Sequence, residues 1–129
     1  MTTKPKIRSI AQVALGLLVL FTGVNKFAKF MSMPEMPEAA TAFMRALADT
    51  GYMMPLIALT EIVVGVLLVA HLWSALALLL LAPVSVNIIL FHLALAPGSI
   101  LLGLVVAFLN LYLLFVYKDA YAPLLRPKR

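Results

Sequence analysis

The chain has 129 residues, of which 64% are hydrophobic and 12% are charged, and its mean hydropathy is +1.09. A soluble domain is usually about half apolar, so this composition excludes an ordinary water-soluble protein. The absence of cysteine excludes disulfides, cysteine-ligated metals and thiol–disulfide chemistry. Most of the net charge of +5 lies close to the two ends of the sequence, where membrane topology accounts for it, and nucleic acid is not an expected partner.

Four apolar blocks are long enough to cross a bilayer, which takes about 20 residues of helix. They predict spans over residues 7–30, 53–70, 73–95 and 98–117. The first block follows a basic stretch, as in a signal peptide, but no small-x-small cleavage site follows it, so we expect an uncleaved span. Pro97 and Gly98 interrupt the helix before the last block. The sequence therefore predicts an all-α membrane protein, a four-transmembrane-helix bundle of up-down topology that forms one domain over residues 1–129.

The connector between the first two spans contains the signals of a short helix. Pro37 and Glu38 are typical of a helix start, and Gly51 is typical of a helix end. The predicted helix, 37–50, is too short to span a membrane. Its apolar face consists of Met36, Ala40, Phe43 and Leu47. We therefore expect an interfacial amphipathic helix, which is either an ordinary connection or a lid over the bundle.

Lysine and arginine residues are distributed unequally between the two sides that these spans define. Seven flank the termini, namely Lys4, Lys6, Arg8, Lys118, Arg126, Lys128 and Arg129. Three lie on the opposite side, namely Lys26, Lys29 and Arg45. The positive-inside rule then places both termini in the cytoplasm and the connector outside. The predicted location is the cytoplasmic (inner) membrane, which the chain crosses several times.

Glu61 stands out because it interrupts the apolar second span. On this topology it lies ~12 Å along that helix. An unpaired charge at the centre of a spanning helix costs ~2.5–3.5 kcal/mol, so such residues normally have partners and often mark function. Lys26, at a compatible depth in the adjacent span, is the expected partner. Glu61 is either structural, as an ion pair or as a protonated glutamate bonded to Asn110, or functional, as a ligand anchor or proton-handling group in an outward-facing pocket. A lipid-facing glutamate is the least favoured alternative.

The candidate site collects the polar residues of the spans. The expected ligand-binding residues are Lys26, Glu61, Asn87, His92 and Asn110. All are placed in the middle and outer parts of the membrane, which leaves an inner half made almost entirely of leucine, valine, alanine and isoleucine. Asn87 and His92 are about 140° apart around a helix, so they need not face one space. His92 is expected to be interfacial or hydrogen-bonded, and no metal site is predicted.

Small residues recur on the same helix faces as these polar groups. Three sets of residues each share one helix face by their spacing. They are Gln12, Gly16, Gly23 and Lys26 in the first span, Glu61 and Gly65 in the second, and Gly103, Asn110 and Tyr117 in the fourth. Glycine permits close approach between helices in a membrane. We therefore expect the polar groups to point toward neighbouring helices.

Five stretches of the sequence resemble the DoxX family of small four-helix membrane proteins. In chain order they are GLLVLFTGVNKFAKF, PEAATAFMRAL, LIALTEIVVGVLLV, VNIILFHLALAPG and LNLYLLFVYKDAYAPLL. The resemblance covers nearly the whole chain, and it implies the same five candidate residues. The family's namesake is a subunit associated with quinone-linked sulfur or terminal oxidase chemistry. Some relatives are discussed alongside thiol redox systems, but the lack of cysteine argues against that role here.

The expected function is binding of a small lipophilic ligand, with a quinone as the best single candidate, by an accessory subunit of a membrane redox system. Lys26 and His92 would donate hydrogen bonds to a quinone carbonyl, and Glu61 would accept or pass a proton. No cofactor motif is present, so an independent oxidoreductase is not expected.

Two other classes of function stay open. One is a membrane assembly or interaction protein, with a redox partner or a second copy of the chain, in which the polar cluster is purely structural. The other is a transporter component, which would need a path from the pocket to the cytoplasm; the aliphatic inner half offers no polar path, so a monomeric channel ranks lowest.

Overall fold

The computed structural model describes residues 3–28 and 37–127, and these residues are almost entirely helical, with no strand among them. In chain order the elements are α1 (Thr3–Ala28), α2 (Glu38–Asp49), α3 (Met53–Ala70), α4 (Ser74–Leu95), the 3₁₀ turn η1 (Pro97–Ser99), α5 (Ile100–Val116), α6 (Lys118–Tyr121) and the 3₁₀ turn η2 (Ala122–Leu125). The predicted all-α class is confirmed. The predicted residues Lys29, Met36, Lys128 and Arg129 lie outside the described part of the chain.

Three helical segments are long and apolar enough to cross a membrane, namely Lys6–Phe27, Met53–Ala70 and Ser74–Leu95. The fourth predicted span, 98–117, corresponds to α5, which has 17 residues and reaches a spanning length only together with Lys118–Leu125, beyond a bend of 74°. The structure therefore contains three candidate spans, or four if the bent pair is one span. At most 28% of each of the three spanning windows is buried inside the protein. The remaining apolar surface needs a lipid environment, which indicates a membrane protein.

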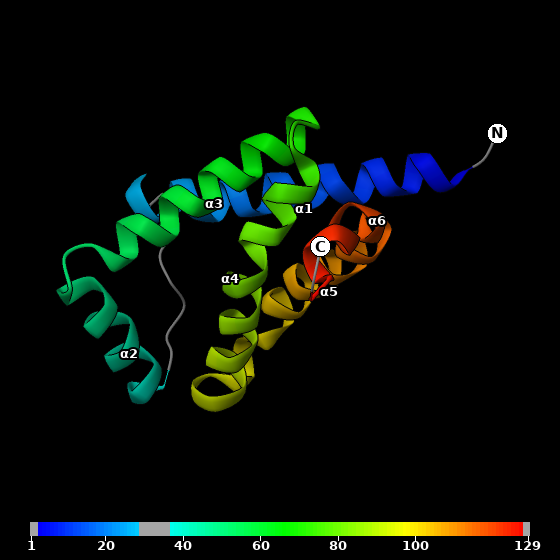
Figure 1. Ribbon diagram of the computed structural model, residues 1–129. Coiled ribbons are helices and arrows are strands. Elements are labelled where there is room, and N and C mark those ends of the chain that lie inside the picture. Colours follow the sequence, from blue (N-terminus) through cyan, green and yellow to red (C-terminus); the bar gives the residue numbers. More distant parts are fainter. Residues whose placement is uncertain (1–2, 29–36, 128–129) are drawn as a thin grey trace.

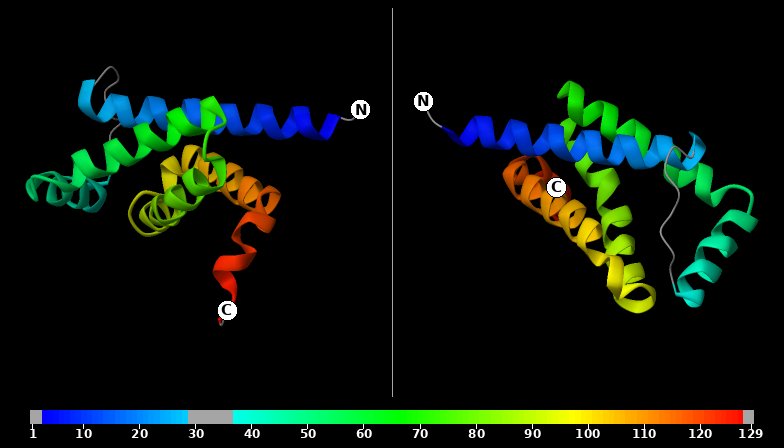
Figure 2. Two further views of the ribbon diagram at one scale, coloured as in Figure 1. Left: turned by 45° about the horizontal axis from the view of Figure 1, so that its top comes forward. Right: turned by 180° about the vertical axis from the view of Figure 1, so that it is seen from behind.

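The long helices form two antiparallel pairs, α1 with α3 and α4 with α5. In Figure 1 and Figure 2, α4 runs steeply across the α1/α3 pair rather than along it. The two pairs meet where α3 turns into α4, which we call the turn end, and diverge toward α2, which we call the connector end. The up-down bundle predicted from the sequence would instead keep the four helices nearly parallel.

The turn between α3 and α4 explains why the pairs diverge. The helix α3 ends with hydrogen bonds from the His71 N–H to the Leu68 carbonyl and from the Leu72 N–H to the Leu67 carbonyl, as in a Schellman motif. His71 and Trp73 both have left-handed backbone conformations, with φ of 57° and 47°. The chain thus reverses within three residues, and the next helix leaves at a steep angle.

Helices α1 and α3 are in backbone contact along a seam of small residues. A Cβ atom on Gly65 would lie 2.7 Å from the Gly16 carbonyl oxygen, and one on Gly23 would lie 2.8 Å from the Ala58 carbonyl oxygen. Real Cβ atoms do not approach backbone this closely, so only glycine fits at these two positions without a shift. The glycine face predicted from the sequence is confirmed for this pair.

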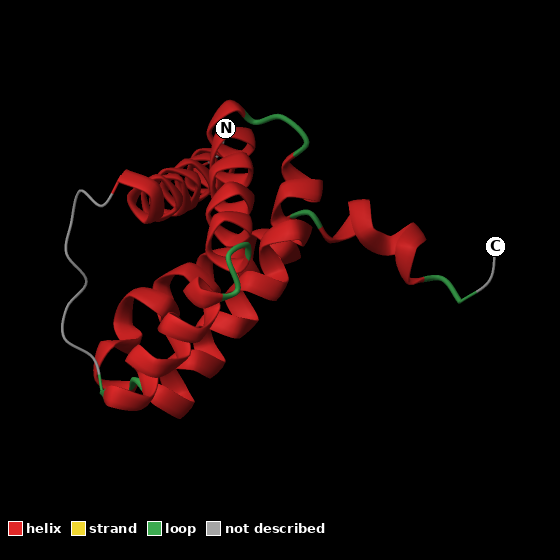
Figure 3. Ribbon diagram, turned by 90° about the vertical axis from the view of Figure 1, so that its left-hand side faces the viewer, coloured by secondary structure: helices red, strands yellow, loops and turns green. Residues whose placement is uncertain are grey.

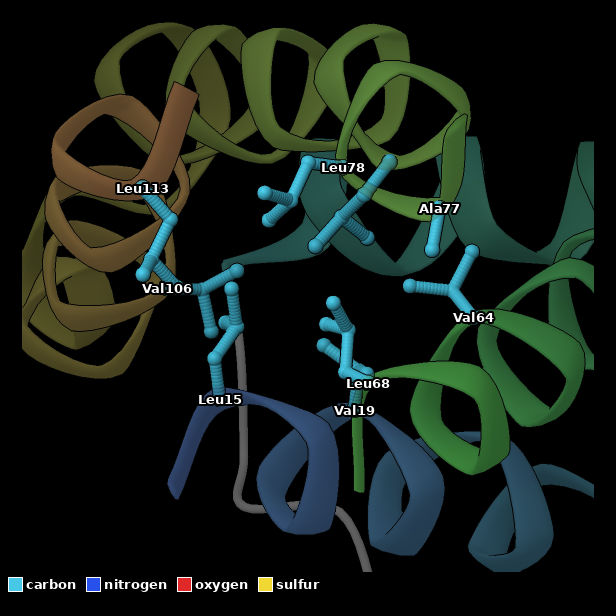
Figure 4. Close-up of a cluster of buried hydrophobic side chains, with 9 residues drawn as sticks. Leu15, Val19, Val64, Leu68, Ala77, Leu78, Val106 and Leu113 are labelled. Atoms are coloured by element: carbon cyan, nitrogen blue, oxygen red, sulfur yellow. The ribbon is translucent and has the colours of Figure 1, made fainter. Parts of the chain in front are cut away.

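The aliphatic core lies where the two pairs meet, and all four long helices contribute to it (Figure 4). Its buried members are Leu15, Val19, Val64, Leu68, Ala77, Leu78, Leu81, Val106 and Leu113. The core therefore lies toward the turn end of the molecule, and the connector end has fewer contacts between the pairs.

One buried amide, that of Gln12, connects four helices at the turn end. Its Nε2 donates to the Leu68 carbonyl oxygen at 3.0 Å and to Ser74 Oγ at 2.7 Å. The Tyr117 hydroxyl donates to Gln12 Oε1 at 2.6 Å. These bonds join α1 to the end of α3, the start of α4 and the end of α5. The prediction of an almost purely aliphatic half at this end is wrong, because it treated Gln12 only as part of the glycine face.

Helix α2 forms where it was predicted, within a residue at each end, and lies at the connector end (Figure 1). Ala40 is buried, and the Phe43 and Phe91 ring centroids are 5.6 Å apart, which connects α2 to α4. Arg45 is exposed. The predicted apolar face of this helix thus contacts the protein, as a docked connecting helix requires.

The α1–α3 seam generates a test of the fold. Gly65→Ala places a methyl group against the Gly16 carbonyl and Leu20, so we expect thermal unfolding in mild detergent to show a loss of about 1–3 kcal/mol. Gly98→Ala is the matched control, because a Cβ atom there meets no atom within 4 Å. Equal melting temperatures for the two variants would contradict a close-packed seam.

Candidate functional site

Glu61 lies midway along α3, and its side chain is directed at α1. The residue is 3% exposed. Lys26 Nζ donates to Glu61 Oε1 at 2.6 Å, and Thr22 Oγ1 lies 3.0 Å from Glu61 Oε2. Each carboxylate oxygen therefore has a donor group of α1 within hydrogen-bonding distance. The ion pair with Lys26 that the sequence predicts is confirmed.

The glycine seam creates this cluster. A Cβ atom on Gly23 would lie 3.0 Å from Glu61 Cβ, so the missing side chain of Gly23 leaves the space into which Glu61 fits. Thr22 and Lys26 are one turn apart on α1 and so reach the same carboxylate from two sides. At a larger separation between the two helices, neither side chain of α1 would meet the carboxylate at hydrogen-bonding distance.

The Thr22 hydroxyl is shared between two acceptors. Its Oγ1 lies 2.9 Å from the Val19 carbonyl oxygen as well as 3.0 Å from the carboxylate of Glu61. A hydroxyl has a single hydrogen, so Thr22 donates to one of these oxygens at a time. The bond from Lys26 is thus the more constant of the two contacts to Glu61, and it is charge-assisted.

Lys26 differs from Glu61 in exposure, since 24% of its side chain is accessible against 4% for the glutamate. An ammonium group has three N–H donors, and Glu61 Oε1 takes one of them. The ammonium group is thus paired with Glu61 while part of the Lys26 side chain lies at the protein surface. Chemically, this arrangement suits a ligand with a hydrogen-bond acceptor and a group that exchanges protons.

Asn110 is buried but belongs to another part of the molecule. Its Nδ2 donates to the Leu78 carbonyl oxygen at 3.2 Å, which connects α5 to the first turns of α4. The predicted interhelical role of Asn110 is confirmed. Its position near the turn end differs from the expected place in the Glu61 pocket.

His92 and Asn87 lie on the part of α4 that diverges from α1 and α3. His92 Nδ1 lies 2.9 Å from the Ile88 carbonyl oxygen, and a carbonyl can only accept, so Nδ1 carries the hydrogen. In the neutral ring Nε2 is then an acceptor. The Asn87 side chain is exposed. Of the five predicted site residues, the structure brings only Lys26 and Glu61 together, because Asn87 and His92 lie on the steeply crossing α4 and Asn110 on its partner α5.

The sequence reasoning missed Thr22 as a partner of Glu61 and Gln12 as a connection between helices. Thr22 had a usable signal, since it precedes Lys26 by one turn and therefore shares its helix face. Gln12 has partners 56 to 105 residues away in the sequence, so only the fold reveals them.

Among the described residues, no group of three or more histidine, aspartate or glutamate side chains could hold a metal ion. Comparisons with protein-family models, with curated proteins and with solved structures find no match to this chain. The geometry of the site is therefore the main basis for a functional proposal.

The contact between Thr22 and Glu61 can be tested with near-isosteric variants. Thr22→Val removes a donor from a buried carboxylate, and we expect a loss of about 1–2 kcal/mol in thermal unfolding. Thr60→Val is the control, because Thr60 Oγ1 donates only to the Leu56 carbonyl of its own helix. If both variants melt alike, Thr22 does not stabilise the carboxylate.

Proposed function

We propose that this protein binds a small lipophilic ligand beside the Lys26–Glu61 pair, with a quinone as the leading candidate, and that it acts as an accessory subunit of a membrane redox system. The observation that carries the proposal is that Lys26 is both paired with Glu61 and partly accessible. Its ammonium group is held 2.6 Å from Glu61 Oε1, yet 24% of the side chain remains accessible. The N–H donors that Glu61 does not take would serve an acceptor on a ligand in the surrounding lipid phase.

The chemistry of a quinone suits these two side chains. Lys26 would donate a hydrogen bond to a quinone carbonyl, and Glu61 would keep the ammonium in place. Reduction of a quinone takes up protons as well as electrons. Glu61 and Lys26 can exchange protons, whereas the electrons would come from a partner protein. The resemblance to DoxX proteins supports the same ligand class.

The role proposed for His92 changes with its geometry. Because its Nδ1 is occupied by the Ile88 carbonyl, the neutral ring presents an acceptor at Nε2 rather than a donor. We therefore assign the quinone carbonyl to Lys26 alone. The accompanying proposal on location is the cytoplasmic membrane, with both termini in the cytoplasm, since the basic residues cluster near the termini.

A second candidate function is assembly or interaction within the membrane. Its support is that both oxygens of Glu61 already have donors, so the cluster is complete without a ligand. The wide apolar surface of the spanning helices would suit contact with another membrane protein. A transport path has less support, because Val19 and Val64 of the aliphatic core lie between Glu61 and the polar residues of the turn end.

The ligand proposal predicts a loss of quinone with a single substitution. The full chain, purified from membranes in mild detergent, should retain quinone that solvent extraction and chromatography detect. Lys26→Met should lower the retained amount roughly tenfold, as expected for one lost charge-assisted hydrogen bond. Lys6→Met, at an exposed position of α1 near the turn end, is the control and should retain quinone.

Two outcomes would contradict this proposal and favour the assembly role. One is wild-type protein that retains no quinone in a detergent that preserves its fold. The other is equal retention by the two variants.

A further inference from the structure

The turn end contains a shallow hollow that the Lys26–Glu61 site does not use. Its volume is about 730 Å³, and its lining comes from the α3–α4 turn, the first turn of α4 and the residue after α5. The lining residues are His71, Trp73, Ser74, Ala75, Leu76 and Tyr117. Leu68, the α3 residue nearest this end in the core, already lies about 10 Å along the helix from Glu61. The hollow is therefore a separate feature.

The walls of the hollow are amphipathic and fixed in place. Trp73 is 74% exposed and provides a large aromatic surface at the rim. The hydroxyl groups of Ser74 and Tyr117 are both bonded to Gln12. His71 Nε2 lies 3.1 Å from Ser9 Oγ, which ties the turn to α1. Tryptophan and tyrosine in such surroundings are typical of the boundary between the hydrocarbon and the headgroups of a bilayer.

Two basic residues are sequence neighbours of residues at this hollow. Arg8 precedes Ser9, the residue in contact with His71, and Lys118 follows Tyr117. Lys118 Nζ lies 4.5 Å above the exposed ring of Phe115, so the ammonium group is at the apolar outer surface. The described acidic residue near these cations is Asp119. The excess of positive charge favours an anionic partner.

The C-terminal segment exposes apolar side chains at this end. After the 74° bend, α6 and η2 turn away from the helix pairs (Figure 3). The Tyr121 hydroxyl donates to the Ala75 carbonyl at 2.6 Å, which fastens the segment to a wall of the hollow. Leu124 and Leu125 are 69% and 79% exposed. Exposed leucines beside cations are typical of a segment that lies in a membrane interface.

We propose that the hollow at the turn end binds the headgroup of an anionic phospholipid. The phosphate would lie near Arg8 and Lys118, and the glycerol and upper acyl chain would contact Trp73 and the exposed leucines. Basic pockets between spanning helices recognise anionic lipids in this way. Free phosphate would leave Trp73 and the leucines without an apolar partner. This proposal is independent of the quinone site.

Native mass spectrometry of the full chain in mild detergent tests the proposal, with phosphatidylglycerol and phosphatidylcholine added separately. We expect phosphatidylglycerol to bind at least about fivefold more strongly, the effect of one cation near a membrane surface. Arg8→Gln and Lys118→Gln should each weaken phosphatidylglycerol binding by about that factor. Arg45→Gln is the control, because it removes the same charge from the connector end and should have no effect.

A second pair of variants tests the hollow itself. Ala75→Trp fills it, and we expect loss of phosphatidylglycerol binding with the melting temperature checked in parallel. Ala94→Trp places the same side chain at an exposed position near the other end of α4, and it should bind as the wild type does. Equal binding of the two lipids, an Arg45→Gln loss as large as that of Arg8→Gln, or displacement of phosphatidylglycerol by an equal concentration of inorganic phosphate would each overturn the proposal.

Discussion

The close approach of α1 and α3 is the constraint on which the rest of this structure depends. Gly16, Gly23 and Gly65 bring the two backbones together, and at that separation Glu61 meets α1 directly. A carboxylate buried in an apolar helix needs a partner. Lys26 of α1 is that partner, and it meets Glu61 across the seam. The candidate site is thus a consequence of helix packing: its charge, its depth and its partial exposure all follow from where the two helices touch.

A second polar element governs the relation between the helix pairs. The Gln12 amide is buried and bonded to three other helices, so an unsatisfied polar group would be left in the core if any of those helices moved away. The bonds are concentrated at the turn end, whereas the α4/α5 pair is free to diverge elsewhere. This explains why the candidate site lies between α1 and α3 alone and why residues of α4 do not complete it. The bonds of Gln12 also fix the walls of the hollow in which we place a lipid headgroup.

Much of this architecture could be predicted from local sequence. The apolar blocks gave the helices, the glycine spacing predicted the seam, and the expected depth of Lys26 predicted the partner of Glu61. The crossing of the pairs could not be predicted, because it depends on His71 and Trp73 adopting left-handed conformations that such residues rarely take. The bend after α5 comes where the apolar stretch ends, at Lys118 and Asp119, so the sequence does mark this position. The turn at His71 and Trp73 decides which polar residues meet, and that is why the five-residue pocket predicted from the sequence reduces to one ion pair.

The central claim is that Lys26 and Glu61 form one coupled unit inside the α1–α3 seam. A double-mutant cycle with Lys26→Met and Glu61→Gln, followed by thermal unfolding in mild detergent, measures this coupling directly. Each single change strands part of a buried pair, and we expect each to cost ~3 kcal/mol, the lower part of the usual range because Lys26 is partly accessible. The double variant should recover much of that loss. Additive destabilisation in the double variant would contradict the account, because it would show that the two residues stabilise the protein independently.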